Sequence, residues 1–179
     1  MERDIEKFYD ENVNSGVGFK FCRIENLQAE LITVGGFMTQ EVFLKPGTTL
    51  FVGDFLQETL TLTSKPAEKN NDQYRKNVVQ FTVPKDRAEI SYGFDTMLRN
   101  RYFIIYEDGN GFKHLLGDLG IGCKFYYDVA HGNGTSPNEY KCRFEFNSKF
   151  ALPVISPTVS NDTLEVLDAE VDSALEPFG

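Results

Sequence analysis

The sequence predicts a mainly β protein of the α+β class, an antiparallel β-sandwich or barrel with one packed helix and terminal arms. Several runs alternate apolar and polar residues with a period of two, as strands with one buried face do. The composition agrees, because 15 glycines and 16 phenylalanines without a tryptophan favour turn-rich β structure over a helical bundle. The length of 179 residues suits a single domain with one sizeable core.

Composition divides the chain into three predicted parts. Residues 1–16 form an N-terminal arm of mixed charge, residues 17–155 a β-rich structural domain, and residues 156–179 an acidic C-terminal arm that is helical or flexible. All 18 basic residues precede residue 150, whereas six of the 27 acidic residues follow it, so the formal charge of -9 divides into about -3 and -6. Four apolar residues of the C-terminal arm fall on one stripe if it is helical: Leu164, Leu167, Val171 and Leu175. Such a helix is marginal without a partner.

The first half of the domain is predicted to contain short strands and turns. Two extended runs fill residues 18–34, and a strand at residues 41–44 runs into a Pro-Gly turn, where proline presets φ and glycine accepts positive φ. Residues 59–63 alternate strictly and predict a strand with one exposed face. Residues 65–76 contain few apolar side chains and are predicted to form a long exposed loop.

The second half contains the one internal helix and the clearest strands. After a strand at residues 79–83, apolar residues follow at helical spacing within residues 86–99: Ile90, Phe94, Met97 and Leu98. An apolar strand at residues 102–106 runs into the sequence "DGNG" at residues 108–111, a hairpin signal because Asn and Gly accept the left-handed region. Two more strands are predicted by their apolar and aromatic content, at residues 123–129 and 140–146.

No catalytic, cofactor-binding or metal-ligating residues are predicted. Cys22, Cys123 and Cys142 are far apart and lack CxxC spacing, so buried reduced thiols are expected rather than a disulfide framework or a zinc site. The two histidines, His114 and His131, lie in or beside predicted loops and outside any elbow such as GxSxG. We therefore expect no enzymatic activity. A pair drawn from the 27 acidic residues leaves one route to hydrolase chemistry open.

Two glycine-containing motifs have ordinary structural interpretations. The "DGNG" segment lacks the later acidic ligands and the closing glutamate of a calcium loop, so a hairpin turn is expected. Gly117, Gly120 and Gly122 do not have GxGxxG spacing and lead into an aromatic strand. A bulge or tight turn is therefore expected there rather than a dinucleotide site.

Charge and hydropathy limit the expected partners. The charge of -9 argues against general nucleic-acid binding, which requires clustered lysine and arginine. No stretch approaches the roughly 18 to 20 apolar residues of a membrane span, and the first residues lack the basic start and apolar run of a secretory signal. We expect a protein that is made in a cytoplasm and has no membrane partner.

The order of elements from Tyr102 onward carries a family resemblance. An apolar strand and the "DGNG" turn lead to "HLLGDLG", the strand "GCKFYYD", the polar loop "HGNGTSPNEY" and the closing "KCRFEFNSKFALP". Upstream, "FLKPGTTLFVGDF" has a strand-turn-strand form. Over about residues 40–155, this order resembles small structural proteins encoded in the tail-gene clusters of phages and prophages of Bacteroides-like bacteria. The resemblance rests on element order and turn placement, and it carries over no catalytic or cofactor residue.

The resemblance implies a virion component, such as a phage tail tube or tail-associated subunit, that assembles into a ring or tube in the bacterial host cytoplasm. Its expected partners are its own copies and other virion proteins, and any contact with DNA would be passive. We expect the assembly contacts to come from residues 1–14, 65–76 and 156–179. The alternative is a monomeric β-sandwich binding module for carbohydrate or protein, which would use exposed Tyr and Phe side chains.

Overall fold

A computed structural model describes the chain in several segments between Gly16 and Ile155. These are residues 16–28, 33–34, 37–38, 44–53, 55–56, 58–84, 88–131 and 138–155. The predicted C-terminal arm and, apart from Gly16, the predicted N-terminal arm lie outside the described residues. Most of the polar loop predicted at residues 131–138 also lies outside the described residues.

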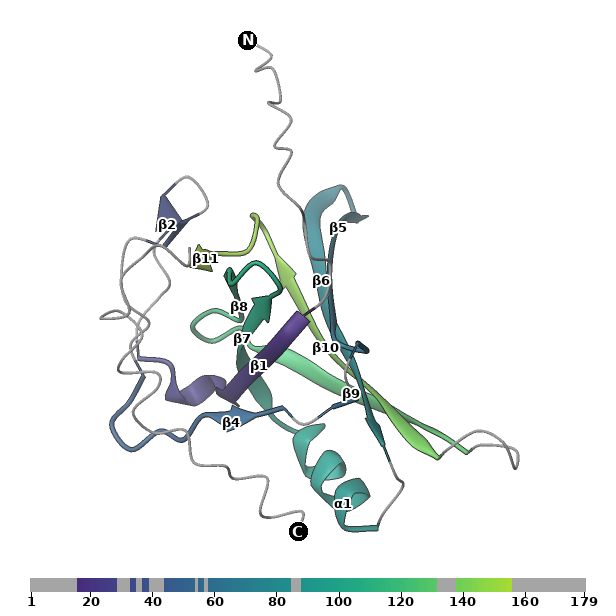
Figure 1. Ribbon diagram of the computed structural model, residues 1–179. Helices are drawn as coiled ribbons and strands as arrows, with labels where there is room; N and C mark the ends of the chain where they lie inside the picture. The colour runs from purple at the N-terminus through teal and green to yellow at the C-terminus, as the bar shows by residue number, and fades with distance from the viewer. Residues whose placement is uncertain are drawn as a thin grey trace.

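The protein is mainly β with one α-helix, so the predicted fold class is confirmed (Figure 1). The strands are β1 (Gly16–Arg23), β2 (Thr33–Val34), β3 (Phe37–Met38), β4 (Phe51–Val52), β5 (Thr61–Lys69), β6 (Asp72–Pro84), β7 (Arg101–Asp108), β8 (Lys113–Leu116), β9 (Cys123–Ala130), β10 (Glu139–Ser148) and β11 (Val154–Ile155). The helices are α1 (Ala88–Met97) and the short 3-10 helix η1 (Ile24–Asn26). Within the described segments the strands form one sheet in the order β2-β3-β11-β8-β7-β9-β10-β6-β5, and β1 pairs with both β7 and β4.

The sheet changes direction at β7, so that its two halves face each other across a shared core (Figure 1). Tyr102 near the start of β7 pairs with β9, whereas residues 104–107 pair with β8. Phe19 of β1 then packs across the core on Phe81 of β6, with ring centroids 4.7 Å apart. The single sheet therefore encloses one core, in which aromatic side chains from its two halves are in contact.

β7 is buried on both of its faces. Its residues 102 to 106 are all buried, which is typical of a central strand and explains their continuous apolar run. One phase of the strand contributes Ile104 to the large core. The other phase contributes Phe103 and Ile105 to a smaller core cluster, whose remaining buried members are Cys22, Leu27, Leu50, Leu115 and Ile155.

Helix α1 closes one end of the large core, within the range predicted from helical spacing. The Phe94 ring lies 5.3 Å from that of Phe125 and 5.2 Å from that of Tyr140. Two hydrogen bonds of 2.6 Å also join the helix to the sheet, from Tyr127 Oη to Asp95 Oδ1 and between the hydroxyls of Ser91 and Tyr140. Apolar packing and polar contacts therefore fix the position of the helix together.

The predicted loop at residues 65–76 is wrong, because these residues form the outer part of a long hairpin of β5 and β6. Asn70 and Asn71 make its two-residue turn, with φ of 55° and 64°. Asparagine accepts this left-handed geometry, which a tight hairpin turn requires. None of the side chains from residue 63 to residue 76 is buried, so the strands lack the apolar alternation that identifies a strand in sequence.

Candidate functional site

The outward face of β9, β10, β6 and β5 is polar. On β10 the buried Tyr140, Cys142, Phe144 and Phe146 alternate with exposed or half-buried polar residues, as the sequence predicted. The register places Arg143 beside Tyr126 of β9 and Gln80 of β6. Four strands therefore present one continuous polar surface on the side opposite the core.

A charge network organises the centre of this surface. Arg143 donates hydrogen bonds from Nη1 to Asp128 Oδ2 (2.8 Å) and from Nε to Glu145 Oε1 (3.1 Å). Glu145 Oε2 also pairs with Lys76 Nζ at 3.1 Å, and the guanidinium carbon lies 5.1 Å from the centre of the Tyr126 ring. The hydrogen bond that Arg143 donates to Asp128 is the main cause that raises the pKa of Arg143. Partly exposed pairs of this kind stabilise little, but they fix the orientation of the side chains.

Beyond this network the hairpin carries an excess of lysine. Register pairs Lys65 with Lys76, Ala67 with Tyr74, and Lys69 with Asp72, so these six side chains share the outward side of the hairpin. We call these six residues the hairpin face. Among the described residues, neither Lys65 nor Lys69 has an ion-pair partner. Like charges directly opposite each other on paired strands are unfavourable, so the Lys65 and Lys76 pair favours an anionic partner.

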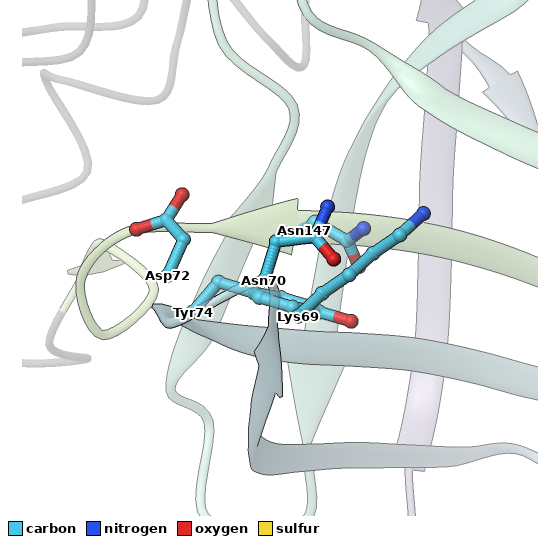
Figure 2. A pocket seen from close by; sticks show the side chains of 5 residues that line it. All are labelled: Lys69, Asn70, Asp72, Tyr74 and Asn147. Atoms are coloured by element: carbon cyan, nitrogen blue, oxygen red, sulfur yellow. The ribbon is translucent and has the colours of Figure 1, made fainter.

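An open pocket of about 490 Å³ lies at the tip of the hairpin face. It is lined by Lys69, Asn70, Asp72, Tyr74 and Asn147. Figure 2 shows these side chains gathered around the turn and the end of β10, with the Asp72 carboxylate and the Lys69 amino group extending to opposite sides. The amides both donate and accept hydrogen bonds, and the tyrosine ring adds an apolar surface. The pocket thus combines charged groups, hydrogen-bonding amides and an aromatic face, an arrangement suited to binding a polar ligand.

The base of the hairpin is held on its inner side by Asn77, which is fully buried. Its Nδ2 donates to the Phe146 carbonyl at 3.2 Å and to Ser148 Oγ at 2.9 Å, so it joins β6 to the end of β10. Further out, Arg75 Nε donates to Ser64 Oγ at 3.2 Å across the two hairpin strands. These contacts connect the exposed part of the hairpin to the packed part of the sheet.

The three cysteines are free and buried, as predicted. Burial raises the pKa of the Cys22 and Cys142 thiols to about 12 and also raises that of Cys123. A thiol must lose its proton to act as a nucleophile or a metal ligand. The cysteines therefore contribute to packing rather than to a reactive site.

The structure places His114 in the hairpin of β7 and β8. Its Nε2 lies 3.1 Å from Asp108 Oδ2, while Asp108 Oδ1 accepts hydrogen bonds from the backbone N–H groups of Asn110 (2.9 Å) and Phe112 (3.0 Å). Asp108 therefore closes the "DGNG" turn, as expected of an aspartate in this position. His131 follows the end of β9. In the described part of the chain, no group of three or more His, Cys, Asp or Glu residues is arranged to hold a metal ion.

Sequence reasoning missed the hairpin face as a surface, although it named residues 65–76 as a contact region. The sequence signal for the hairpin was the pair Asn70 and Asn71, because asparagine is accepted in a tight turn. Polar runs of similar length flank this pair on both sides. The register that brings Lys65 opposite Lys76 depends on that turn. Because the turn was not predicted, the sequence did not indicate that the two lysines lie opposite each other.

Comparison with known proteins adds no relative. No family model, curated protein or solved structure matches the chain. Over the residues that the structure describes, no helix combines the length and the apolar character needed to cross a membrane.

Proposed function

We propose that this protein is a structural virion component, a phage tail tube or tail-associated subunit that assembles with its own copies into a ring or tube. The observation that carries the proposal is the hairpin of β5 and β6, whose outer part extends past the last buried side chains. A two-stranded hairpin exposed on both faces is marginal on its own. Contact with a neighbouring subunit would cover it and stabilise it.

The hairpin is suited to contact through its face rather than by adding another strand. β5 ends the strand path of the described sheet, and Pro66 within it offers no backbone N–H to a further strand. Lys65 and Lys69 on the same strand disfavour edge pairing as well. A partner would therefore contact the side chains of the hairpin face.

The chemistry of the site also supports a structural role. The described surface offers an ordered charge network, a polar pocket and a paired hairpin, which are features of recognition. A tube or ring subunit needs a rigid sheet and elements that reach its neighbours around a symmetry axis. The element order that resembles phage tail proteins agrees with this role.

Solution mass measured by analytical ultracentrifugation over a concentration series, together with electron microscopy, tests the proposal. We expect closed rings or tubes, and a protein that stays monomeric at high concentration would contradict it. Ala67→Glu, which adds charge to the hairpin face, should weaken association. Gln80→Glu, an exposed change on the same strand pair but nearer the core, is the matched control and should not.

A monomeric binding module remains the second candidate, favoured by the pocket that combines Tyr74 with the amides of Asn70 and Asn147. An aromatic ring flanked by planar polar groups suits a sugar ring, with stacking on one side and paired hydrogen bonds on the other. A glycan array probed with monomeric protein tests this candidate. Saturable binding that Tyr74→Ala abolishes would favour it over assembly.

A further inference from the structure

We propose that the hairpin face binds the acidic C-terminal arm of a second copy of this chain. The inference rests on the proposed self-assembly and names the two surfaces that would meet. The hairpin face is rich in lysine, whereas the C-terminal arm has six acidic and no basic residues. Support for the contact comes in three parts, which concern charge, apolar contact and the identity of the copy.

Charge is the first part. Lys65 and Lys76 lie directly opposite each other, and Lys69 follows on the same side of β5. Of these three lysines, only Lys76 has an acidic partner among the described residues, namely Glu145 at 3.1 Å. Asp72 opposite Lys69 offsets one of the three charges. The hairpin face is thus basic in a chain whose formal charge is -9, and an acidic segment would relieve the repulsion between its lysines.

Apolar contact is the second part. Between the lysines of the hairpin face lie Ala67 and Tyr74, which form a cross-strand pair, and Val78 continues the same side toward the core. All three are half-buried, so each leaves apolar surface exposed. In the sequence of the C-terminal arm, Leu164, Leu167, Val171 and Leu175 have the spacing of one helical stripe, and a helix with such a stripe would require a partner surface. The apolar pair of Ala67 and Tyr74, with lysines on both sides of it along the hairpin, matches that pattern.

The identity of the copy is the third part. The described part of the chain ends in β11, which begins six residues after Ser148 of β10, and Ser148 pairs with Arg75 of the hairpin. The strand path therefore does not separate the arm from its own hairpin, and it is the proposed self-assembly that assigns the arm to a second copy. An arm bound to the hairpin of the next copy makes a head-to-tail contact, which generates a closed ring when the rotation between copies closes. This is the symmetry that the proposed ring or tube requires.

Reciprocal charge reversal in the full chain tests the contact. Lys65→Glu with Lys69→Glu, and separately Asp168→Lys with Asp172→Lys, should each weaken self-association about tenfold or more. The four changes together should restore association to within roughly threefold of the wild type, because the pairs are re-formed with opposite sign. Lys124→Gln, on β9 of the same outward surface, is the control, because it places no like charge opposite Glu145 and should leave association unchanged.

Carbodiimide cross-linking in an equal mixture of isotope-labelled and unlabelled protein identifies which copy supplies the arm. We expect cross-links from arm carboxylates to Lys65 or Lys69 that join one labelled and one unlabelled peptide. Cross-links confined to peptides of the same label would show that each arm binds its own hairpin, and would overturn the inference. Circular dichroism of each variant verifies that a loss of association does not come from unfolding, and the neutral pair Lys65→Gln with Lys69→Gln replaces any variant that does unfold.

The outcomes also separate this inference from the proposed function. If rings or tubes form and neither charge reversal weakens them, the inference fails while self-assembly stands. If the wild-type protein remains monomeric at every concentration, the proposed function fails, and the inference fails with it. If both reversals weaken assembly but their combination does not restore it, the two surfaces do not contact each other and the inference is again overturned.

Discussion

The aromatic ring of Phe19 packs directly against Gly53, and the backbone N–H of Gly53 donates a 3.1 Å hydrogen bond to the Phe19 carbonyl. A Cβ atom at position 53 would overlap the ring. The absence of a side chain there lets the segment after β4 lie against β1 while Phe19 remains in contact with Phe81 and Phe144. The absence of a side chain at position 53 thus permits this close approach to the Phe19 ring.

Gly53→Ala should therefore lower the free energy of unfolding by about 1 to 3 kcal/mol, the range for overpacking a close-packed site. The measurement is urea denaturation followed by circular dichroism. Gly18→Ala is the matched control on β1, because a Cβ there meets nothing within 4 Å. This control should be neutral or stabilise the fold by up to about 1 kcal/mol. Equal losses from the two substitutions would contradict the role given to Gly53.

The hairpin turn provides a second prediction. Asn71 has a φ of 64°, a region that β-branched residues avoid at substantial cost. Asn71→Val should lower the free energy of unfolding by about 1 kcal/mol or more, and Asn71→Gly should be neutral or slightly stabilising. Gln73→Val, an exposed change two residues later in β6, should stay within about 0.5 kcal/mol. Thermal denaturation measures all three, and a tolerated Asn71→Val would show that the turn has another geometry.

The helix and the strands that could be predicted from the sequence are those with one buried face or a long apolar run. The alternation of Tyr140, Cys142 and Phe144 identified β10, because burial selects side chains with a period of two. Phe94 and its helical spacing identified α1 for the same reason. Where the core constrains each residue, the pattern of apolar and polar residues follows the structure closely. The structure can then be predicted from that pattern.

The hairpin of β5 and β6 escaped prediction because the core does not constrain its outer part. Its strands are held by backbone pairing and by a turn, so polar residues and even Pro66 are compatible with it. The pairing of β1 with β7 escaped for a different reason, since it joins Phe19 to Tyr106 across most of the domain. Local patterns do not encode such partners. The candidate site was thus predicted as a region of the chain but not as a surface.

Asn77 provides a third prediction, at the base of the hairpin. Asn77→Ala removes the Nδ2 donor to Ser148 Oγ and to the Phe146 carbonyl, and the contact with the Phe146 carbonyl is a buried one. The free energy of unfolding should fall by about 1 to 3 kcal/mol, and amide exchange in the outer hairpin should accelerate. Gln80→Ala, exposed on the opposite face of the same strand, should change stability by less than about 0.5 kcal/mol. Unchanged exchange in Asn77→Ala would show that other contacts hold the hairpin.

The contact between Tyr127 and Asp95 provides a prediction about pH. The hydrogen bond to the Asp95 carboxylate is the main cause that raises the pKa of Tyr127 to about 12, with burial adding to it. The phenol donates this bond only while it keeps its proton, and in the unfolded chain it ionises near pH 10.0. The folded state therefore binds the proton more tightly than the unfolded state. This contribution to stability is fully present below about pH 10 and is lost as pH rises toward 12.

Tyr127→Phe lacks both the hydrogen bond and the ionisation. The wild type should be the more stable protein at neutral pH, and its advantage over Tyr127→Phe should shrink steadily between pH 10 and pH 12. Burial also raises the pKa of Tyr102 and Tyr106, but those groups are common to both proteins and cancel in the difference. Chemical denaturation at a series of pH values measures the difference in the free energy of unfolding between the two proteins. Tyr126→Phe, on the opposite face of β9, retains the contact with Asp95, so its difference from the wild type should not follow this pH dependence. A Tyr127→Phe difference that stays constant through pH 12 would show that the hydrogen bond does not hold α1 to the sheet.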